Sequence, residues 1–129
     1  MFDFIKSRIA SFGHAFHGWA YVIRNEKNAW VHATATICVV ILGIWLAIPI
    51  HDWALLILTI AMVWAAEFFN TSIEAVVDLA SPSHHPLAKV GKDVGAAAVL
   101  ISAGAAVLIG LILLGPPLWA RISPYFSHF

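Results

Sequence analysis

Residues 94–120 read VGAAAVLISAGAAVLIGLILLGPPLWA, which is 27 residues without an Asp, Glu, Lys or Arg. About 20 consecutive apolar residues are enough for a helix to cross the hydrocarbon core of a bilayer. Residues 28–51 form a second uncharged segment, of 24 residues. The two segments predict two membrane-spanning helices and place the chain in the class of all-α membrane proteins.

A third uncharged segment, residues 53–66, has 14 residues, which is too short to cross the bilayer unaided. The apolar pattern continues after it with Phe68, Phe69, Ile73, Val76 and Val77. A span of sufficient length must therefore contain Glu67. We expect three transmembrane helices, the second of which carries an acid.

The composition of the 129 residues agrees with this, since 61% are hydrophobic and 11% charged, against about 45–50% and about 25% in soluble domains. It excludes a soluble globule, and three spans leave no room for a separate soluble catalytic domain. Seven basic residues balance seven acidic ones, so the basic field of a nucleic-acid-binding protein is missing and we expect no such partner.

The N-terminal region has apolar residues at alternating steps of three and four: Phe2, Ile5, Ile9, Phe12, Phe16, Trp19 and Ile23. This spacing predicts an amphipathic helix on the membrane surface; packing of the same helix on the bundle is the alternative. We expect one integral membrane domain over residues 1–129, with the amphipathic helix and its link in 1–27 and a three-span bundle in 28–120.

Basic residues predict how the spans are oriented. Those near the spans are Lys6, Arg8, Arg24 and Lys27 before the first, Lys89 and Lys92 between the second and third, and Arg121 after the last. By the positive-inside rule, the N-terminus and residues 79–93 are cytoplasmic and the C-terminus lies outside. Pro116 and Pro117 are expected to end the third helix.

Polar residues of the second span share one face, within an arc of roughly 100°: Glu67, Asn70, Thr71, Glu74 and Asp78. An ionised acid at bilayer depth costs about 2.5–3.5 kcal/mol, so this face must meet protein, water or a bound cation. Glu67, the deepest acid, suits removal of a proton from an alcohol, whereas Glu74 and Asp78, nearer water, suit Mg²⁺. Hydrogen bonding to neighbouring helices alone is the other interpretation.

Lys89, Lys92 and Asp93 precede the third span, and Glu26 and Lys27 precede the first, all on the predicted cytoplasmic side. Such a region can hold both a cation and an anion, and a lysine beside Mg²⁺ can neutralise phosphate charge during phosphoryl transfer. Simple anchoring of the span is the alternative role of the lysines.

Three histidines have no assigned role. His84 and His85 are expected to be solvated loop residues, with metal ligation as the alternative. His32 is expected to be a polar residue that packs between helices.

Small residues recur at steps of four in the third span: Ala98, Ser102, Ala106 and Gly110. They predict close helix packing within or between chains. Because three spans enclose a polar face poorly, we expect an oligomer.

The segment EFFNTSIEAVVD at residues 67–78, followed by HPLAK at 85–89 and KDVG at 92–95, resembles the prokaryotic diacylglycerol kinase family. With Asn25-Glu26 the likeness extends over about residues 18–110. It implies a small lipid kinase of the prokaryotic inner membrane that uses MgATP at a site facing the cytoplasm. It also implies a homotrimer with three transmembrane helices and an amphipathic N-terminal helix per chain.

Carried over by position, the resemblance implies that Glu67 is the general base on the lipid hydroxyl and that Glu26 and Glu74 hold the metal. The residues implied to contact the nucleotide are Glu26, Asn70, Asp78, Lys92 and Asp93.

The leading hypothesis is therefore an ATP-dependent lipid kinase that converts diacylglycerol to phosphatidic acid or undecaprenol to undecaprenyl phosphate. The acceptor stays open because Ala96 stands where many diacylglycerol kinases have Ser, and His32 stands where some have Glu. His32 is more similar to the undecaprenol kinase branch. The alternatives are a cation-conducting or transport subunit whose pore the polar face lines, and a purely structural membrane-assembly protein.

Overall fold

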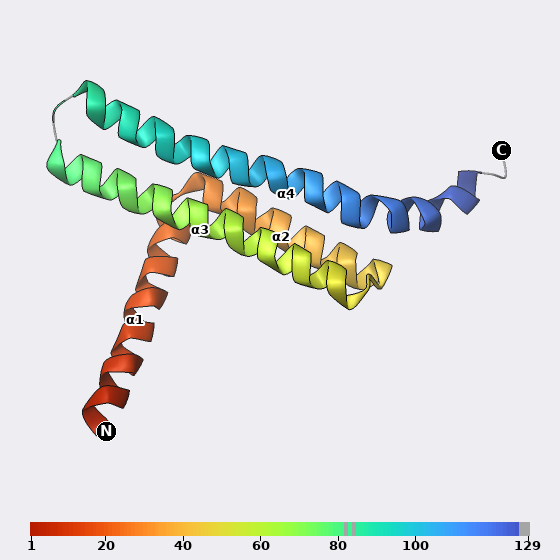
Figure 1. Ribbon diagram of the computed structural model, residues 1–129, viewed down its shortest axis with the longest axis horizontal. Helices are drawn as coiled ribbons and strands as arrows, with labels where there is room; N and C mark the ends of the chain where they lie inside the picture. Colours follow the sequence, from red (N-terminus) through yellow and green to blue (C-terminus); the bar gives the residue numbers. More distant parts are fainter. Residues whose placement is uncertain (82, 84, 127–129) are drawn as a thin grey trace.

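The computed structural model describes residues 1–81, 83 and 85–126 of the chain. In that part of the chain the regular elements are four helices: α1 (Phe2–Asn25), α2 (Lys27–Leu46), α3 (Ile50–Ala80) and α4 (Pro86–Phe126). Figure 1 shows α2, α3 and α4 running lengthwise beside one another, whereas α1 leaves the bundle at a steep angle. His84, whose role the sequence left open, lies outside the described residues.

The three long helices α2, α3 and α4 are each long and apolar enough to cross a membrane. The expectation of three spans is confirmed in these terms, and Glu67 does lie within the second, α3. Helix α2 has 20 residues and α3 has 31, so α2 is too short to follow α3 along its whole length. The C-terminal end of α3 and the N-terminal end of α4 extend beyond the start of α2 (Figure 1).

A tight turn joins α2 to α3 at the end of the bundle far from α1 (Figure 1). Helix α2 ends at Ala47, which adopts the left-handed conformation with φ 53° and whose N–H bonds back to the carbonyl of Gly43. A Cβ on Gly43 would lie 3.0 Å from ring carbons of Trp53. The two helices therefore approach closely here because residue 43 has no side chain.

A small apolar core lies at this end of the bundle. Its buried members come from α2, the turn, α3 and α4: Leu46, Ile48, Leu56 and Leu114. Because every span contributes to it, this cluster holds the three helices together at the end opposite the polar residues of α3.

Helix α1 forms over Phe2–Asn25, but only its C-terminal part contacts the bundle. Trp19 packs against Trp64 and Phe68 of α3, with ring centroids 4.9 and 4.8 Å apart. Towards the N-terminus, Ile9, Phe12 and the other apolar residues of the helix are exposed. The described contacts include nothing that covers this exposed face, and its placement on a membrane surface stays a prediction.

The expected end of the last helix at Pro116 and Pro117 is wrong, because α4 continues through both residues to Phe126. Proline removes one backbone N–H and crowds the preceding turn, which bends a helix without necessarily ending it. Figure 1 shows α4 changing direction near its C-terminal end.

The close packing predicted for the small residues of α4, within or between chains, has no partner within the chain at Gly110. No side chain or neighbouring helix lies within 4 Å of the position that a Cβ would take on this residue. Packing of these small residues against another chain stays a prediction.

Candidate active site

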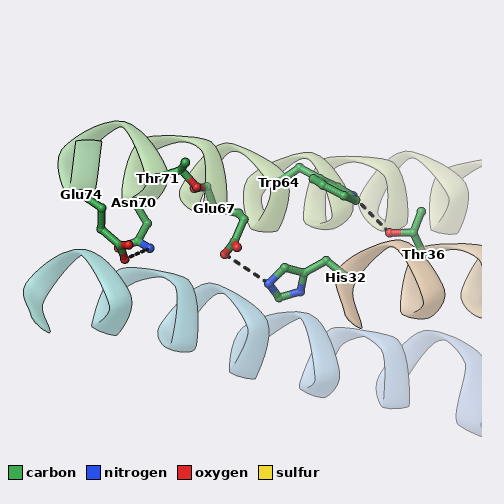
Figure 2. Close-up of polar contacts among 7 residues, drawn as sticks. All are labelled: His32, Thr36, Trp64, Glu67, Asn70, Thr71 and Glu74. Atoms are coloured by element: carbon green, nitrogen blue, oxygen red, sulfur yellow. Dashed lines mark hydrogen bonds and ion pairs between the residues drawn. The ribbon is translucent and has the colours of Figure 1, made fainter. Parts of the chain in front are cut away.

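Glu67 is fully buried in the middle of α3, with 0% of its surface exposed. Its carboxylate lies between α3 and α2, where Nε2 of His32 is 3.5 Å from Oε2 of Glu67 (Figure 2). Neither carboxylate oxygen has a hydrogen-bond partner among the described residues. Since a buried carboxylate is normally satisfied by several donors, these oxygens retain the capacity to accept a proton from a bound molecule.

An aromatic residue of α3 adjoins His32, the partner of Glu67. The His32 ring stands edge-on to Trp64, with centroids 6.3 Å apart, and the Trp64 indole N–H donates to Oγ1 of Thr36 at 3.3 Å. Figure 2 shows the His32 ring reaching from α2 towards Glu67. Trp19 of α1 packs on Trp64 in turn, so apolar rings of low dielectric adjoin His32, the partner of Glu67.

Asn70 lies one turn from Glu67, towards the cytoplasmic end predicted for α3, and bonds to the next acid of the helix face. Its Nδ2 donates to Oε1 of Glu74 at 2.8 Å, and both side chains point towards α4 in Figure 2. Oδ1 of Asn70 is buried without a described partner. It lies 2.5 Å from the position that a Cβ would take on Gly95, so only glycine at this place in α4 leaves room for the amide.

Further along, the ends of α3 and α4 are joined by a charge pair. Lys92 Nζ of α4 lies 2.5 Å from Oδ1 of Asp78 on α3, and it also interacts electrostatically with Glu74. A cavity of about 720 Å³ adjoins this pair; Asp78, Lys89, Lys92 and Asp93 are among its lining residues. A cavity of this size lies within the range of small-molecule sites.

Glu26 is the single residue between α1 and α2, in an extended conformation with φ −99° and ψ 118°. It is half-buried. Its charge and that of Glu74 both act on Glu67, so each of the two acids lies near enough to Glu67 to interact with it. Residues from the α1–α2 junction and from two turns of α3 thus contribute to one acidic region.

The structure therefore brings Glu26 and Glu74 each within electrostatic reach of Glu67, and Lys92 within reach of Glu74 and Asp78. Asp93 is differently placed, since its exposed carboxylate pairs with Lys89 one turn earlier on the same helix. It shares the cavity lining with Lys92. The roles assigned to these residues stay predictions.

Sequence reasoning missed two features of the site. It did not predict that His32 lies against the carboxylate of Glu67. It also did not predict that Gly95 leaves the space occupied by the amide of Asn70. The only signal for His32 was a polar residue in an otherwise apolar segment, and the only signal for Gly95 was its place in the segment KDVG. His85 is exposed, and its Nδ1 accepts a hydrogen bond from the N–H of Leu87 in the first turn of α4.

No group of three His, Cys, Asp or Glu residues in the described part of the chain is arranged to hold a metal ion. The donors that are present are nevertheless of the type Mg²⁺ prefers: the carboxylates of Glu26 and Glu74 and the unpaired Oδ1 of Asn70. Magnesium sites for nucleotides commonly use one or two carboxylates, with water and phosphate oxygens as the other ligands. In chemical type, these donors suit Mg²⁺ bound together with a nucleotide.

Comparison with known proteins places residues 13–114 within a family model described as prokaryotic diacylglycerol kinase. An undecaprenol kinase of Bacillus subtilis is 40% identical over 108 residues, which are 84% of this chain and 88% of that protein. A diacylglycerol kinase of Synechocystis is 39% identical over 85% of this chain and 63% of its own length. A diacylglycerol kinase of Escherichia coli K12 is 34% identical, over 82% of this chain and 87% of its own length.

Proposed function

Because this chain belongs to the prokaryotic diacylglycerol kinase family and is a lipid kinase, we propose that it transfers the γ-phosphoryl group of ATP to a membrane lipid, either diacylglycerol or undecaprenol. The products are phosphatidic acid or undecaprenyl phosphate, together with ADP. A relative named undecaprenol kinase is 40% identical to the chain and one named diacylglycerol kinase is 39% identical. Sequence identity therefore does not decide which of the two lipids is the acceptor. The comparisons do not favour the alternative of a cation-conducting or transport subunit.

In the proposed reaction, Glu67 is the general base. One of its unpaired carboxylate oxygens accepts the proton of the lipid hydroxyl as the hydroxyl oxygen forms a bond to the γ-phosphorus of ATP. The bond between that phosphorus and the bridging oxygen breaks at the same time, and ADP leaves with its electron pair. His32, at 3.5 Å from Glu67, orients the base and is the group that stabilises its negative charge.

Nucleotide binding is assigned to the open ends of α3 and α4. Lys92 is proposed to contact a phosphate oxygen, since it is a cation in the lining of the cavity between the ends of α3 and α4. Asn70, Asp78, Asp93 and Glu26 complete the proposed nucleotide contacts. The cavity of about 720 Å³ supports this assignment because Asp78, Lys92 and Asp93 line it together.

Glu26 and Glu74 are the residues proposed to hold Mg²⁺, with the carbonyl oxygen of Asn70 as a neighbouring oxygen donor. When bound, Mg²⁺ neutralises charge on the phosphate groups. The hydrogen bond from Asn70 to Glu74 holds the Glu74 carboxylate in one orientation, which is the role expected of an outer partner of a metal ligand.

The chain is a membrane protein with three apolar spans. We assign the site to the cytoplasmic side of a prokaryotic inner membrane, because basic residues lie at that end of the bundle.

We also propose that the protein works as a homotrimer and that residues 1–129 form one domain. The open flank of α3 and α4 beyond the start of α2 supports this, since a neighbouring copy can cover it (Figure 1).

The observation that carries the proposal is the buried carboxylate of Glu67. It lies 3.5 Å from His32, has no hydrogen-bond partner among the described residues and shares a helix face with Glu74. The test is transfer of label from radiolabelled ATP to lipid by purified protein in a bilayer. Diacylglycerol and undecaprenol are supplied singly and then in competition, and the preferred acceptor is the one whose phosphorylation resists competition. Absence of transfer to both lipids would overturn the proposal.

A further inference from the structure

The indole ring of Trp64 lies on α3, one turn of helix before Glu67. It meets the ring of His32 on α2 at an interplanar angle of 69°, with the two ring centroids 6.3 Å apart. It also packs against Trp19 of α1, at a centroid distance of 4.9 Å. Trp64 therefore contacts both α2 and α1 beside the proposed base.

Two further contacts hold the Trp64 ring in place. Its indole N–H donates to Oγ1 of Thr36 on α2 at 3.3 Å, and Phe68 packs against it with ring centroids 6.1 Å apart. Thr36 lies four residues after His32, so the two residues share one face of α2. Figure 2 shows the Trp64 indole directed towards Thr36 and the His32 ring directed towards Glu67. One indole thus joins α3 to the face of α2 that presents His32.

The direction of the His32 ring depends on what packs against it. Its Nε2, which faces Glu67, is buried without a hydrogen-bond partner in the part of the chain that the structure describes. The distance of 3.5 Å to Oε2 of Glu67 exceeds the usual range of about 2.7–3.2 Å for such a bond. The second torsion of a histidine side chain is broad, so the rotamer alone does not decide which way the ring faces. The edge-to-face contact with Trp64 supplies a specific geometry instead.

We propose that Trp64 is a positioning residue, which keeps the imidazole of His32 facing Glu67 and acts on the reaction only through this pair. The inference rests on the proposed function, in which His32 orients the base, and it adds the residue that orients His32. Because Trp64 also packs on Trp19, the place of α1 beside the bundle becomes part of the geometry of the base. A displacement of about 1 Å at a reacting group can lower a rate by about 10²-fold.

Three variants separate the effect of the indole ring from that of its hydrogen bond. Trp64→Leu removes the ring, Trp64→Phe keeps a ring without an N–H group, and Thr36→Val removes the hydrogen-bond acceptor on α2. Trp119→Leu is the matched control, because Trp119 is an exposed tryptophan near the C-terminal end of α4. Phosphorylation is measured in bilayers to obtain kcat and the KM values for ATP and for the lipid.

Trp64→Leu is expected to lower kcat about 10–100-fold, while both KM values stay near those of the wild type. Trp64→Phe and Thr36→Val lose the same hydrogen bond, so each should lower kcat by a similar and smaller factor, about two- to tenfold. Phenylalanine thus recovers part of the kcat that leucine loses. Trp119→Leu should match the wild type. An unchanged kcat in Trp64→Leu, or an equal loss in Trp119→Leu, would overturn the inference.

A double-mutant cycle tests whether Trp64 acts through His32. If it does, adding Trp64→Leu to His32→Leu lowers kcat no further, because the ring that Trp64 positions is already missing. A tryptophan with a merely structural role would lower kcat by the same factor in both backgrounds, and this additive result would overturn the inference. Should Trp64→Leu fail to fold, the same cycle is measured with Trp64→Phe.

A measurement without turnover distinguishes this inference from the proposed function. The protein is labelled with ¹⁵N-histidine, and the NMR signals of the His32 ring are identified as those missing from the His32→Leu spectrum. They should move in Trp64→Leu and stay in place in Trp119→Leu. Unmoved His32 signals in Trp64→Leu would overturn the inference. If they move but the wild type phosphorylates neither diacylglycerol nor undecaprenol, Trp64 does position His32 and the proposed kinase reaction is the part that fails.

Discussion

His32 of α2 lies with its Nε2 3.5 Å from Oε2 of Glu67 on α3, and both groups are shielded from solvent. This relationship joins two spans that are 35 residues apart in the chain at the point where the proposed chemistry occurs. It supplies a partner for a carboxylate that would otherwise be isolated in an apolar surrounding, where an unpaired charge is costly. The pair therefore affects both the stability of the bundle and the state of the proposed base.

Glu67→Gln is expected to reduce phosphoryl transfer by about 10²–10⁴-fold, the usual contribution of a general base. The amide has nearly the same shape but does not accept the hydroxyl proton. Lipid phosphorylation and thermal unfolding are measured on the same preparation. Near wild-type transfer by a well-folded Glu67→Gln protein would show that another group is the base.

His32→Leu is expected to lower the free energy of unfolding by about 1–3 kcal/mol, because the Glu67 carboxylate loses its buried polar partner. It should also lower kcat while the KM for ATP stays constant. His32→Gln, whose amide can donate to Glu67, should recover part of kcat. Thr34→Val is the control, since Thr34 is exposed and its hydroxyl donates to the carbonyl of Trp30 on the same helix. Equal kcat in the Leu and Gln variants would contradict the positioning role.

Gly95→Ala is expected to displace Asn70, because the added Cβ would lie 2.5 Å from its Oδ1. Overpacking of this kind costs about 1–3 kcal/mol, and kcat/KM for ATP should fall roughly tenfold as Asn70 releases Glu74. Gly91→Ala on the same helix is the matched control, since its Cβ would meet Val77 at an ordinary 3.6 Å. If the two alanine variants have the same unfolding free energy and the same kcat/KM for ATP, the close approach of Gly95 to Asn70 is not needed for nucleotide use.

Lys92→Gln is expected to raise the KM for ATP about tenfold or more, the effect of losing a charge-assisted hydrogen bond to phosphate. The KM for the lipid should stay near the wild-type value. Lys6→Gln removes the same charge from an exposed position on α1 and serves as the control. A rise in the KM for lipid alone would place Lys92 outside the nucleotide site.

Glu74→Gln is expected to raise the Mg²⁺ concentration needed for half-maximal activity, because one proposed carboxylate ligand is lost. Activity should recover at high Mg²⁺, and removal of Mg²⁺ by EDTA should abolish transfer by the wild type. Activity is measured as a function of free Mg²⁺ at saturating ATP. An unchanged Mg²⁺ dependence in Glu74→Gln would exclude this residue as a ligand.

Most of the helical architecture could be predicted from the sequence, because the hydropathy and charge of a segment are local properties. The uncharged segments anticipated the three spans, and helical periodicity placed Asn70 and Glu74 on the same face as Glu67. The end of α4 could not be predicted in this way. Proline acts on the turn before it, and whether the helix ends or bends depends on the surroundings.

The sequence by itself determined that this protein is a three-span membrane protein with a buried acid, because the length of each apolar segment leaves no other solution in a bilayer. Only the tertiary structure decided what that acid faces. The contacts of His32 with Glu67, of Gly95 with Asn70 and of Trp64 with His32 join different helices. Such features depend on how helices are set against one another, which no local pattern of residues specifies.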